Sequence, residues 1–168
     1  MKIDWKGTVN RLPEPTFRWL GVNDSTMELT GEICPGAGLR REGSPEGIMI
    51  LSEGEAGWAE LAGNENIRKA WEMASGMGEA AAGLMNEKRA GRTLIYAAEG
   101  SRTREPVRLA ARRGESGLEE QLIYAEKDSE LTVLMEYESP REASGTLGIR
   151  TLIRAESGAR VHLVKVQM

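Results

Sequence analysis

The sequence is short of the residues that form disulfides and metal sites, since its 168 residues include one cysteine, Cys34, and one histidine, His162. A single cysteine excludes an internal disulfide and fits a reducing compartment. One thiol and one imidazole also exclude an intramolecular metal site built mainly from Cys and His. If a metal cluster takes part in the function, we expect most of its ligands to come from elsewhere.

Long apolar segments and an excess of basic charge are also absent. No run of about 18 apolar residues is present, and Met1-Lys2-Ile3-Asp4 does not lead into the apolar segment of a signal peptide. These absences predict a cytoplasmic protein without a membrane partner. The 26 acidic and 22 basic residues give a net charge of −4 and are mixed along the chain, so no basic stripe predicts binding to nucleic acid.

The sequence does contain a repeated tetrapeptide. Its three copies start 28 and then 30 residues apart, and each is followed by a short turn-like segment of acidic and small residues. The copies are Leu94-Ile95-Tyr96-Ala97, Leu122-Ile123-Tyr124-Ala125 and Leu152-Ile153-Arg154-Ala155. A unit of this length does not usually bury its apolar face alone and must stack on its neighbours. The repeat therefore predicts a coil of stacked strands.

The second half of the chain has the period of two that is typical of strands. Turn residues separate its apolar segments at short intervals, so that six strands, two for each repeat, fit between Thr93 and Met168. A sandwich or a meander would also give short strands, but neither requires the first strand of each unit to resemble the next. We therefore favour a β-solenoid and leave the sandwich as the alternative.

The first half has a different pattern. The first 50 residues carry four of the six prolines, and we interpret them as an irregular arm with one helical turn after Thr16 and a short strand at 48–51. Residues 64–89 predict a helical hairpin, because apolar residues recur at helical spacing on both sides of a Gly-containing break. These residues are Ile67, Ala70, Trp71 and Ala74, then Ala80, Ala81, Leu84 and Met85. The chain thus divides into an N-terminal arm and helical region, 1–91, and the first rungs of a β-helix core, 92–168.

Four segments together resemble the SufB/SufD family of the Suf iron–sulfur cluster assembly system, and most closely the N-terminal portion of a SufD-like protein. They are the Pro-Thr-Phe-Arg-Trp-Leu-Gly segment from Pro15, the stretch from Gly83-Leu84-Met85-Asn86 to Glu105-Pro106-Val107, the strand pair within 122–137, and the segment 158–167 that ends in Lys-Val-Gln. The resemblance implies a helical N-terminal region followed by a right-handed parallel β-helix. Family members are considerably longer, so it also implies a truncated β-helix, the front portion of such a protein.

The resemblance implies a function as well. It indicates a non-enzymatic scaffold subunit that contacts SufB-like and SufC-like subunits, the latter an ABC-type ATPase. It implies no cofactor bound by this segment, with the iron–sulfur cluster held in the assembled complex. No residue here matches the family's cluster-assembly cysteine and histidine, so no catalytic, cofactor-binding or metal-binding residue is assigned. The immediate partner could be SufB, a second copy or another protein, and a SufB paralogue stays open beside SufD.

Two isolated residues could carry chemistry outside these motifs. Cys34 lies outside the matched segments, and we interpret it as an incidental thiol rather than a sulfur acceptor or cluster ligand. His162 shares a strand face with Val164 and Val166, which favours a packed, hydrogen-bonded residue over a metal ligand.

The competing function is a carbohydrate-binding or polysaccharide-cleaving β-helix protein. Glu119 and Glu120 would point to opposite faces of a strand, whereas Glu136 and Glu138 share a side as joint catalysis requires. Such pairs arise by chance among 26 acids, and we expect solvated faces to account for all four residues. A third alternative is a fragment whose open end aggregates.

Overall fold

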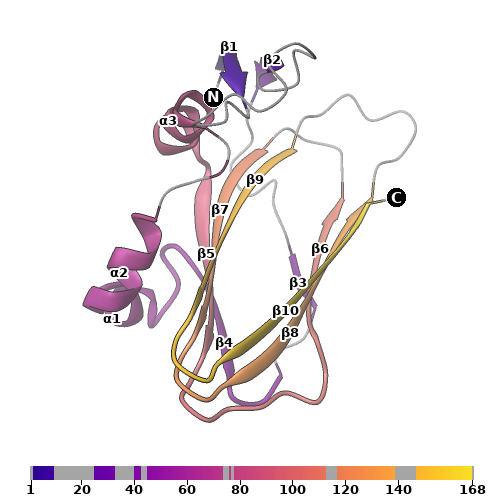
Figure 1. Cartoon of the computed structure of the whole chain (residues 1–168). Helices are drawn as coiled ribbons and strands as arrows, with labels where there is room; N and C mark the ends of the chain where they lie inside the picture. Colours follow the sequence, from indigo (N-terminus) through magenta and orange to yellow (C-terminus); the bar gives the residue numbers. More distant parts are fainter. Residues whose placement is uncertain are drawn as a thin grey trace, which may run out of the picture.

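The computed structural model describes residues 2–9, 25–32, 40–42, 45–73, 76, 78–112, 117–138 and 147–167. The described chain is mainly β, as predicted, with three sheets and three short helices (Figure 1). The smallest sheet is an antiparallel pair of β1 (Lys2–Val9) and β2 (Ser25–Glu32). Each of the other two sheets has four strands.

These two larger sheets face each other and converge at one end (Figure 1). The first has the order β4 (Ile48–Ser52), β5 (Gly91–Ala97), β7 (Gly117–Ala125) and β9 (Leu147–Ala155). The second has the order β3 (Arg40–Glu42), β6 (Val107–Arg112), β8 (Glu130–Glu138) and β10 (Arg160–Gln167). From β5 onward the chain alternates between the sheets, and all six predicted strands of the second half are present.

The predicted stacking of the repeats is confirmed at the level of strand register. β5, β7 and β9 are parallel, with Leu94 opposite Leu122 and Leu122 opposite Leu152. β6, β8 and β10 are parallel in the same way. Parallel neighbours place equivalent residues of successive repeats side by side. The 28- and 30-residue spacings in the sequence are therefore the offsets between paired residues of neighbouring strands.

The turns that join the two sheets also stack on one another. In each turn one residue has a positive φ: Gly100 at 68°, Asp128 at 57° and Gly158 at 72°. The amide of Gly100 donates to the carbonyl of Lys127 at 2.9 Å, and the amide of Asp128 donates to the carbonyl of Ser157 at 3.0 Å. These bonds satisfy backbone groups that a lone turn would leave to water. They extend the parallel ladder around the corner between the sheets.

The main core lies between the two sheets. Fully buried side chains from each sheet meet there, with Ile95 and Ile123 from one side and Val133 and Met135 from the other. The strands β5 and β7 are buried on both faces, because helices cover the face turned away from the core (Figure 1).

The helices are α1 (Trp58–Ala62), α2 (Glu65–Trp71) and α3 (Glu79–Lys88). The side chain of Asn64 caps α2, since its Oδ1 accepts from the amides of Asn66 at 2.9 Å and Ile67 at 3.4 Å. α2 packs its buried face on Leu94 and Leu122, while α3 packs on β1 and on Leu118. The helices therefore hold the outer face of the first large sheet.

Two expectations about the N-terminal half are corrected. Ile67, Ala70 and Trp71 form the buried face of α2 as predicted, but α2 and α3 join different core clusters instead of packing on each other as a hairpin, and Ala80 is exposed. The expectation of an irregular arm is corrected for the described part of the first 50 residues, since 2–9, 25–32 and 40–42 form β1, β2 and β3. The strand predicted at 48–51 is confirmed as β4, whereas Thr16 and Ala74 lie outside the described residues.

Within the part of the chain described here, no helix is both long enough and apolar enough to cross a bilayer.

Candidate functional site

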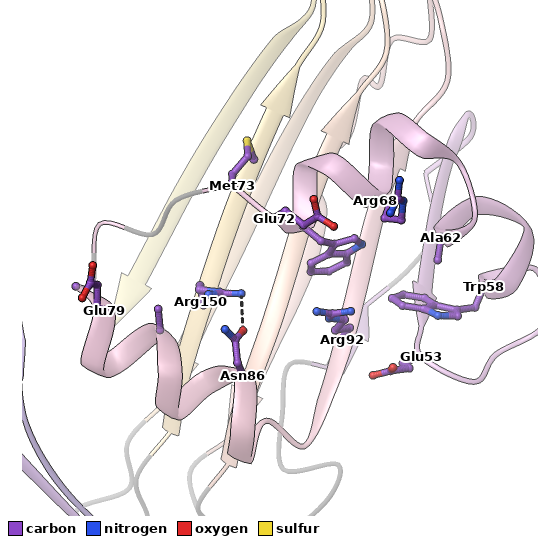
Figure 2. Close-up of a pocket in the computed structure, with 13 residues that line it drawn as sticks. Glu53, Trp58, Ala62, Arg68, Glu72, Met73, Glu79, Asn86, Arg92 and Arg150 are labelled. Carbon is purple, nitrogen blue, oxygen red and sulfur yellow. Dashed lines mark hydrogen bonds between the residues drawn. The ribbon is translucent and has the colours of Figure 1, made fainter.

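A pocket of about 620 Å³ lies on the outer face of the first large sheet, between the sheet and the helices (Figure 2). α1 and α2 contribute Trp58, Arg68 and Trp71 to its wall, and α3 contributes Asn86. The strands contribute two arginines, Arg92 from β5 and Arg150 from β9. Its volume is in the range of small-molecule sites in proteins.

Under this pocket the strand register brings together a ladder of three charged residues. Arg92 is opposite Glu120, and Glu120 is opposite Arg150, at the same spacing as the leucines of the repeat. The Glu120 side chain is 0% exposed, Nε of Arg92 donates to its Oε2 at 2.8 Å, and Nη2 of Arg150 pairs with its Oε1. The expectation that Glu120 lies on a solvated face is wrong, because α3 and the neighbouring arginines cover it.

A third arginine adds to the excess of positive charge in the ladder. Nε of Arg89, at the end of α3, lies 3.9 Å from Oε2 of Glu120, so three guanidinium groups surround one carboxylate. Burial lowers the pKa of Arg150, and repulsion from Arg92 and Arg89 lowers it further. The pKa of Arg89 is lowered by burial and by Arg92, against an opposing attraction from Glu53. The base of the pocket thus carries a surplus of positive charge at low exposure.

Neighbouring residues fix the orientation of Arg92 and Arg150, the two arginines that the strands contribute to the pocket. The guanidinium of Arg92 lies over the ring of Trp71, 4.9 Å from its centroid, and Trp71 is tilted by 47° against Trp58. Nη2 of Arg150 donates to Oδ1 of Asn86 at 3.4 Å (Figure 2). Nε of Arg150 is buried and has no hydrogen-bond partner among the described residues. Such a group can still donate to an anionic ligand.

A second candidate surface is the open edge formed by β9 and β10. Within the described residues, β9 pairs only with β7 and β10 only with β8. The inner column of Ile95, Ile123 and Ile153 is fully buried at its first two positions, but Ile153 on β9 is 43% exposed. Val164 on β10 is 46% exposed. Apolar side chains beside unpaired backbone groups are the features that a pairing strand recognises.

Lys165 limits how apolar this edge is. It is opposite Met135 in the register and therefore points toward the space between the sheets. Its Nζ donates to Oγ1 of Thr151 on β9 at 3.1 Å, and burial lowers its pKa. An inward-pointing lysine is one of the ways by which edge strands discourage unspecific pairing.

The residues considered in the sequence are dispersed in space. His162 is exposed on the outer face of β10, which corrects the expectation of a packed residue, and Cys34 lies outside the described residues. Glu136 is half-buried and Glu138 exposed on β8, which belongs to the other large sheet from the arginine ladder. Among the residues that the structure describes, no three His, Cys, Asp or Glu side chains are grouped so that they could hold a metal ion.

The arginine ladder could have been found in the sequence, because Arg92, Glu120 and Arg150 each stand two residues before a repeated leucine.

Comparison of the chain with protein-family models, with curated proteins and with solved structures finds no match.

Proposed function

We propose that this chain is a scaffold subunit of a Suf-type iron–sulfur cluster assembly complex, similar to SufD, and that its stacked strands are rungs of a right-handed parallel β-helix. The resemblance of four sequence segments suggests the family. The parallel register of β5, β7 and β9 and the hydrogen bonds between successive turns are the features that a coil of this kind requires.

The observation that supports a scaffold role is the exposed inner column at the β9 edge. Ile95 and Ile123 are fully buried by the strand that follows each of them in the sheet, whereas Ile153 is 43% exposed at the edge of the sheet. An added strand, from a further rung of the coil or from a partner, would pair with the backbone of β9 and bury Ile153. We propose that a SufB-like subunit occupies this edge, in a complex that also contains a SufC-like ATPase.

In this proposal the chain is cytoplasmic, binds no cofactor itself and catalyses no reaction. The iron–sulfur cluster is the product of the assembled complex, and ligands from other chains or segments hold it. The role of the chain is to present a rigid, stacked surface, in keeping with the use of repeat proteins as binding scaffolds.

The carbohydrate alternative is less well supported by the pocket geometry. Arg92 covers the ring of Trp71, which is itself buried, so that half-buried Trp58 is left as the aromatic side chain of the pocket wall on which a sugar could stack. Glu120, beneath the pocket, is enclosed by arginines and cannot reach a substrate, which leaves only the exposed carboxylates of the wall, Glu53, Glu72 and Glu79, among the described residues that line the pocket.

Co-expression with SufB-like and SufC-like subunits tests the scaffold role. If only the chain carries an affinity tag, we expect both subunits to remain with it through affinity and size-exclusion chromatography. Elution of the chain without either subunit would contradict the proposal. Release of reducing sugars from polysaccharides, or retention on an oligosaccharide column, would instead favour the alternative.

A further inference from the structure

The arginine pocket has features of a ligand site that a purely structural ion pair does not need. An enclosed carboxylate requires one or two cationic partners, but Glu120 has three arginines within 4.0 Å. Two of them, Arg92 and Arg150, also line the pocket, whereas Glu120 is 0% exposed beneath them. A molecule that enters the pocket therefore meets guanidinium groups and not the carboxylate that partly neutralises them.

The donors of these two arginines are only partly used. Nε of Arg92 and Nη2 of Arg150 are committed to Glu120, while the buried Nε of Arg150 has no partner among the described residues. The guanidinium of Arg92 lies over the ring of Trp71, 4.9 Å from its centroid, and that of Arg150 donates to Asn86. Fixed, planar guanidinium groups bind carboxylates and phosphates well, because little side-chain freedom is lost on binding.

The rest of the pocket is suited to the body of a small molecule. Trp58, Met73 and Ala82 give it apolar walls, and Arg68 adds a third cation (Figure 2). Three glutamates, Glu53, Glu72 and Glu79, also line it, but all three are exposed. Water screens charges at exposed positions much more than charges at the buried base. The electrostatic preference is therefore positive at the base of the pocket.

We propose that this pocket binds a small organic anion, with its carboxylate or phosphate group on Arg92 and Arg150 and its apolar body against Trp58. The ligand and the scaffold role use different faces of the sheet: Arg150 of β9 lines the pocket on the outer, helix-covered face, whereas Ile153 of the same strand continues the inner column of Ile95 and Ile123. Failure to bind SufB-like or SufC-like subunits would leave the anion site intact, and loss of the anion site would leave the scaffold role intact.

Isothermal titration calorimetry of the whole chain with three probes of similar shape tests this inference. Phenyl phosphate and benzoate carry the two candidate anionic groups, and benzyl alcohol is the neutral control. We expect saturable 1:1 binding of at least one anion, and the stronger of the two identifies the preferred group. Benzyl alcohol should bind at least about tenfold more weakly, because it lacks the charge-assisted hydrogen bonds.

Three variants locate the binding. Arg92→Lys keeps a positive charge beside Glu120 but loses the planar donor pair, so affinity for the anion should fall about tenfold or more. Arg68→Gln removes an exposed cation of the pocket wall and should weaken binding without affecting folding. Arg108→Gln is the matched control, because Arg108 is exposed on β6 in the other sheet. Equal binding of all three probes, no saturable binding, or equal losses in Arg68→Gln and Arg108→Gln would overturn the proposal.

Discussion

The hydroxyl of Tyr124 on β7 donates a hydrogen bond of 3.0 Å to Oε1 of Glu156, which lies in the turn of the following repeat. Tyr124 also stacks on Tyr96 of the preceding repeat, with ring centroids 6.2 Å apart and planes 14° from parallel. In the third repeat Arg154 takes the position of the tyrosine, and its Nε donates to the same carboxylate at 2.9 Å. This column on the outer face joins the three repeats by side chains in addition to the backbone ladder.

Removing the Tyr124 hydroxyl should weaken this connection. We expect Tyr124→Phe to lower the free energy of unfolding by about 1 kcal/mol, the usual net contribution of a hydrogen bond. Urea denaturation followed by circular dichroism measures the change. Tyr137→Phe is the control, since the Tyr137 hydroxyl bonds to the thioether of Met135 at 3.5 Å and should contribute less. Equal losses in the two variants would contradict the role of the column.

The hydrogen bond between Tyr124 and Glu156 also predicts how stability changes at alkaline pH. Burial and, after it, the hydrogen bond to Glu156 together raise the pKa of Tyr124 from 10.0 to about 12. The folded chain therefore holds the proton more tightly than the unfolded chain. This stabilisation is complete below the unfolded pKa and is lost as the pH rises from 10.0 to about 12. Urea denaturation across this range should show a steeper loss of stability for the wild type than for Tyr124→Phe.

Glu120 should be among the polar side chains that matter most for stability. Because three arginines surround it away from water, Glu120→Gln leaves buried positive charge without a partner and should cost about 3–5 kcal/mol. Thermal and urea denaturation measure this cost. Glu130→Gln is the matched control, since Glu130 pairs with Arg160 only at 3.9 Å near the surface and should cost no more than about 1 kcal/mol. A similarly small effect at Glu120 would mean that water reaches the ladder.

Two turn glycines, Gly100 and Gly158, allow the cost of backbone strain to be separated from the cost of a steric clash. Gly100 and Gly158 have similar positive φ values, 68° and 72°, so alanine at either position should cost about 1 kcal/mol of backbone strain. A Cβ at Gly100 meets nothing within 4 Å, whereas one at Gly158 would overlap the carboxylate of Asp128 in the turn before it. Gly158→Ala should therefore be the more destabilising of the two in denaturation experiments. A cost at Gly158 no larger than that at Gly100 would contradict this expectation and would mean that the exposed carboxylate of Asp128 moves aside.

The sequence predicts the stacked half of the chain well, because equivalent residues of parallel strands must have matching shapes. The spacing of Leu94, Leu122 and Leu152 is the register that the structure has. The same offset in Arg92, Glu120 and Arg150 predicts the buried ladder, but charged residues are ordinarily assigned to solvent when strands are considered singly. Only the stacking of strands and helices explains why a glutamate can be buried there.

The N-terminal half is less predictable for two physical reasons. β1 has the alternation of a strand, with Ile3 and Trp5 on one side. Its partner is β2, which begins 16 residues after β1 ends, and local patterns do not identify a distant partner. The helices of this half cover β5 and β7, which are buried on both faces, so periodicity alone cannot say which face the helices cover.

The scaffold role is tested most directly by a pair of charge substitutions at equally exposed apolar residues. Ile153 on β9 and Met49 on β4 are both 43% exposed, and they lie on the opposite edge strands of the same sheet. In co-purification with a SufB-like subunit, we predict that Ile153→Glu reduces the bound fraction at least about tenfold, while Met49→Glu leaves it near that of the wild type. Retention of the SufB-like subunit by Ile153→Glu at the wild-type level, or equal losses in both variants, would contradict docking at the β9 edge.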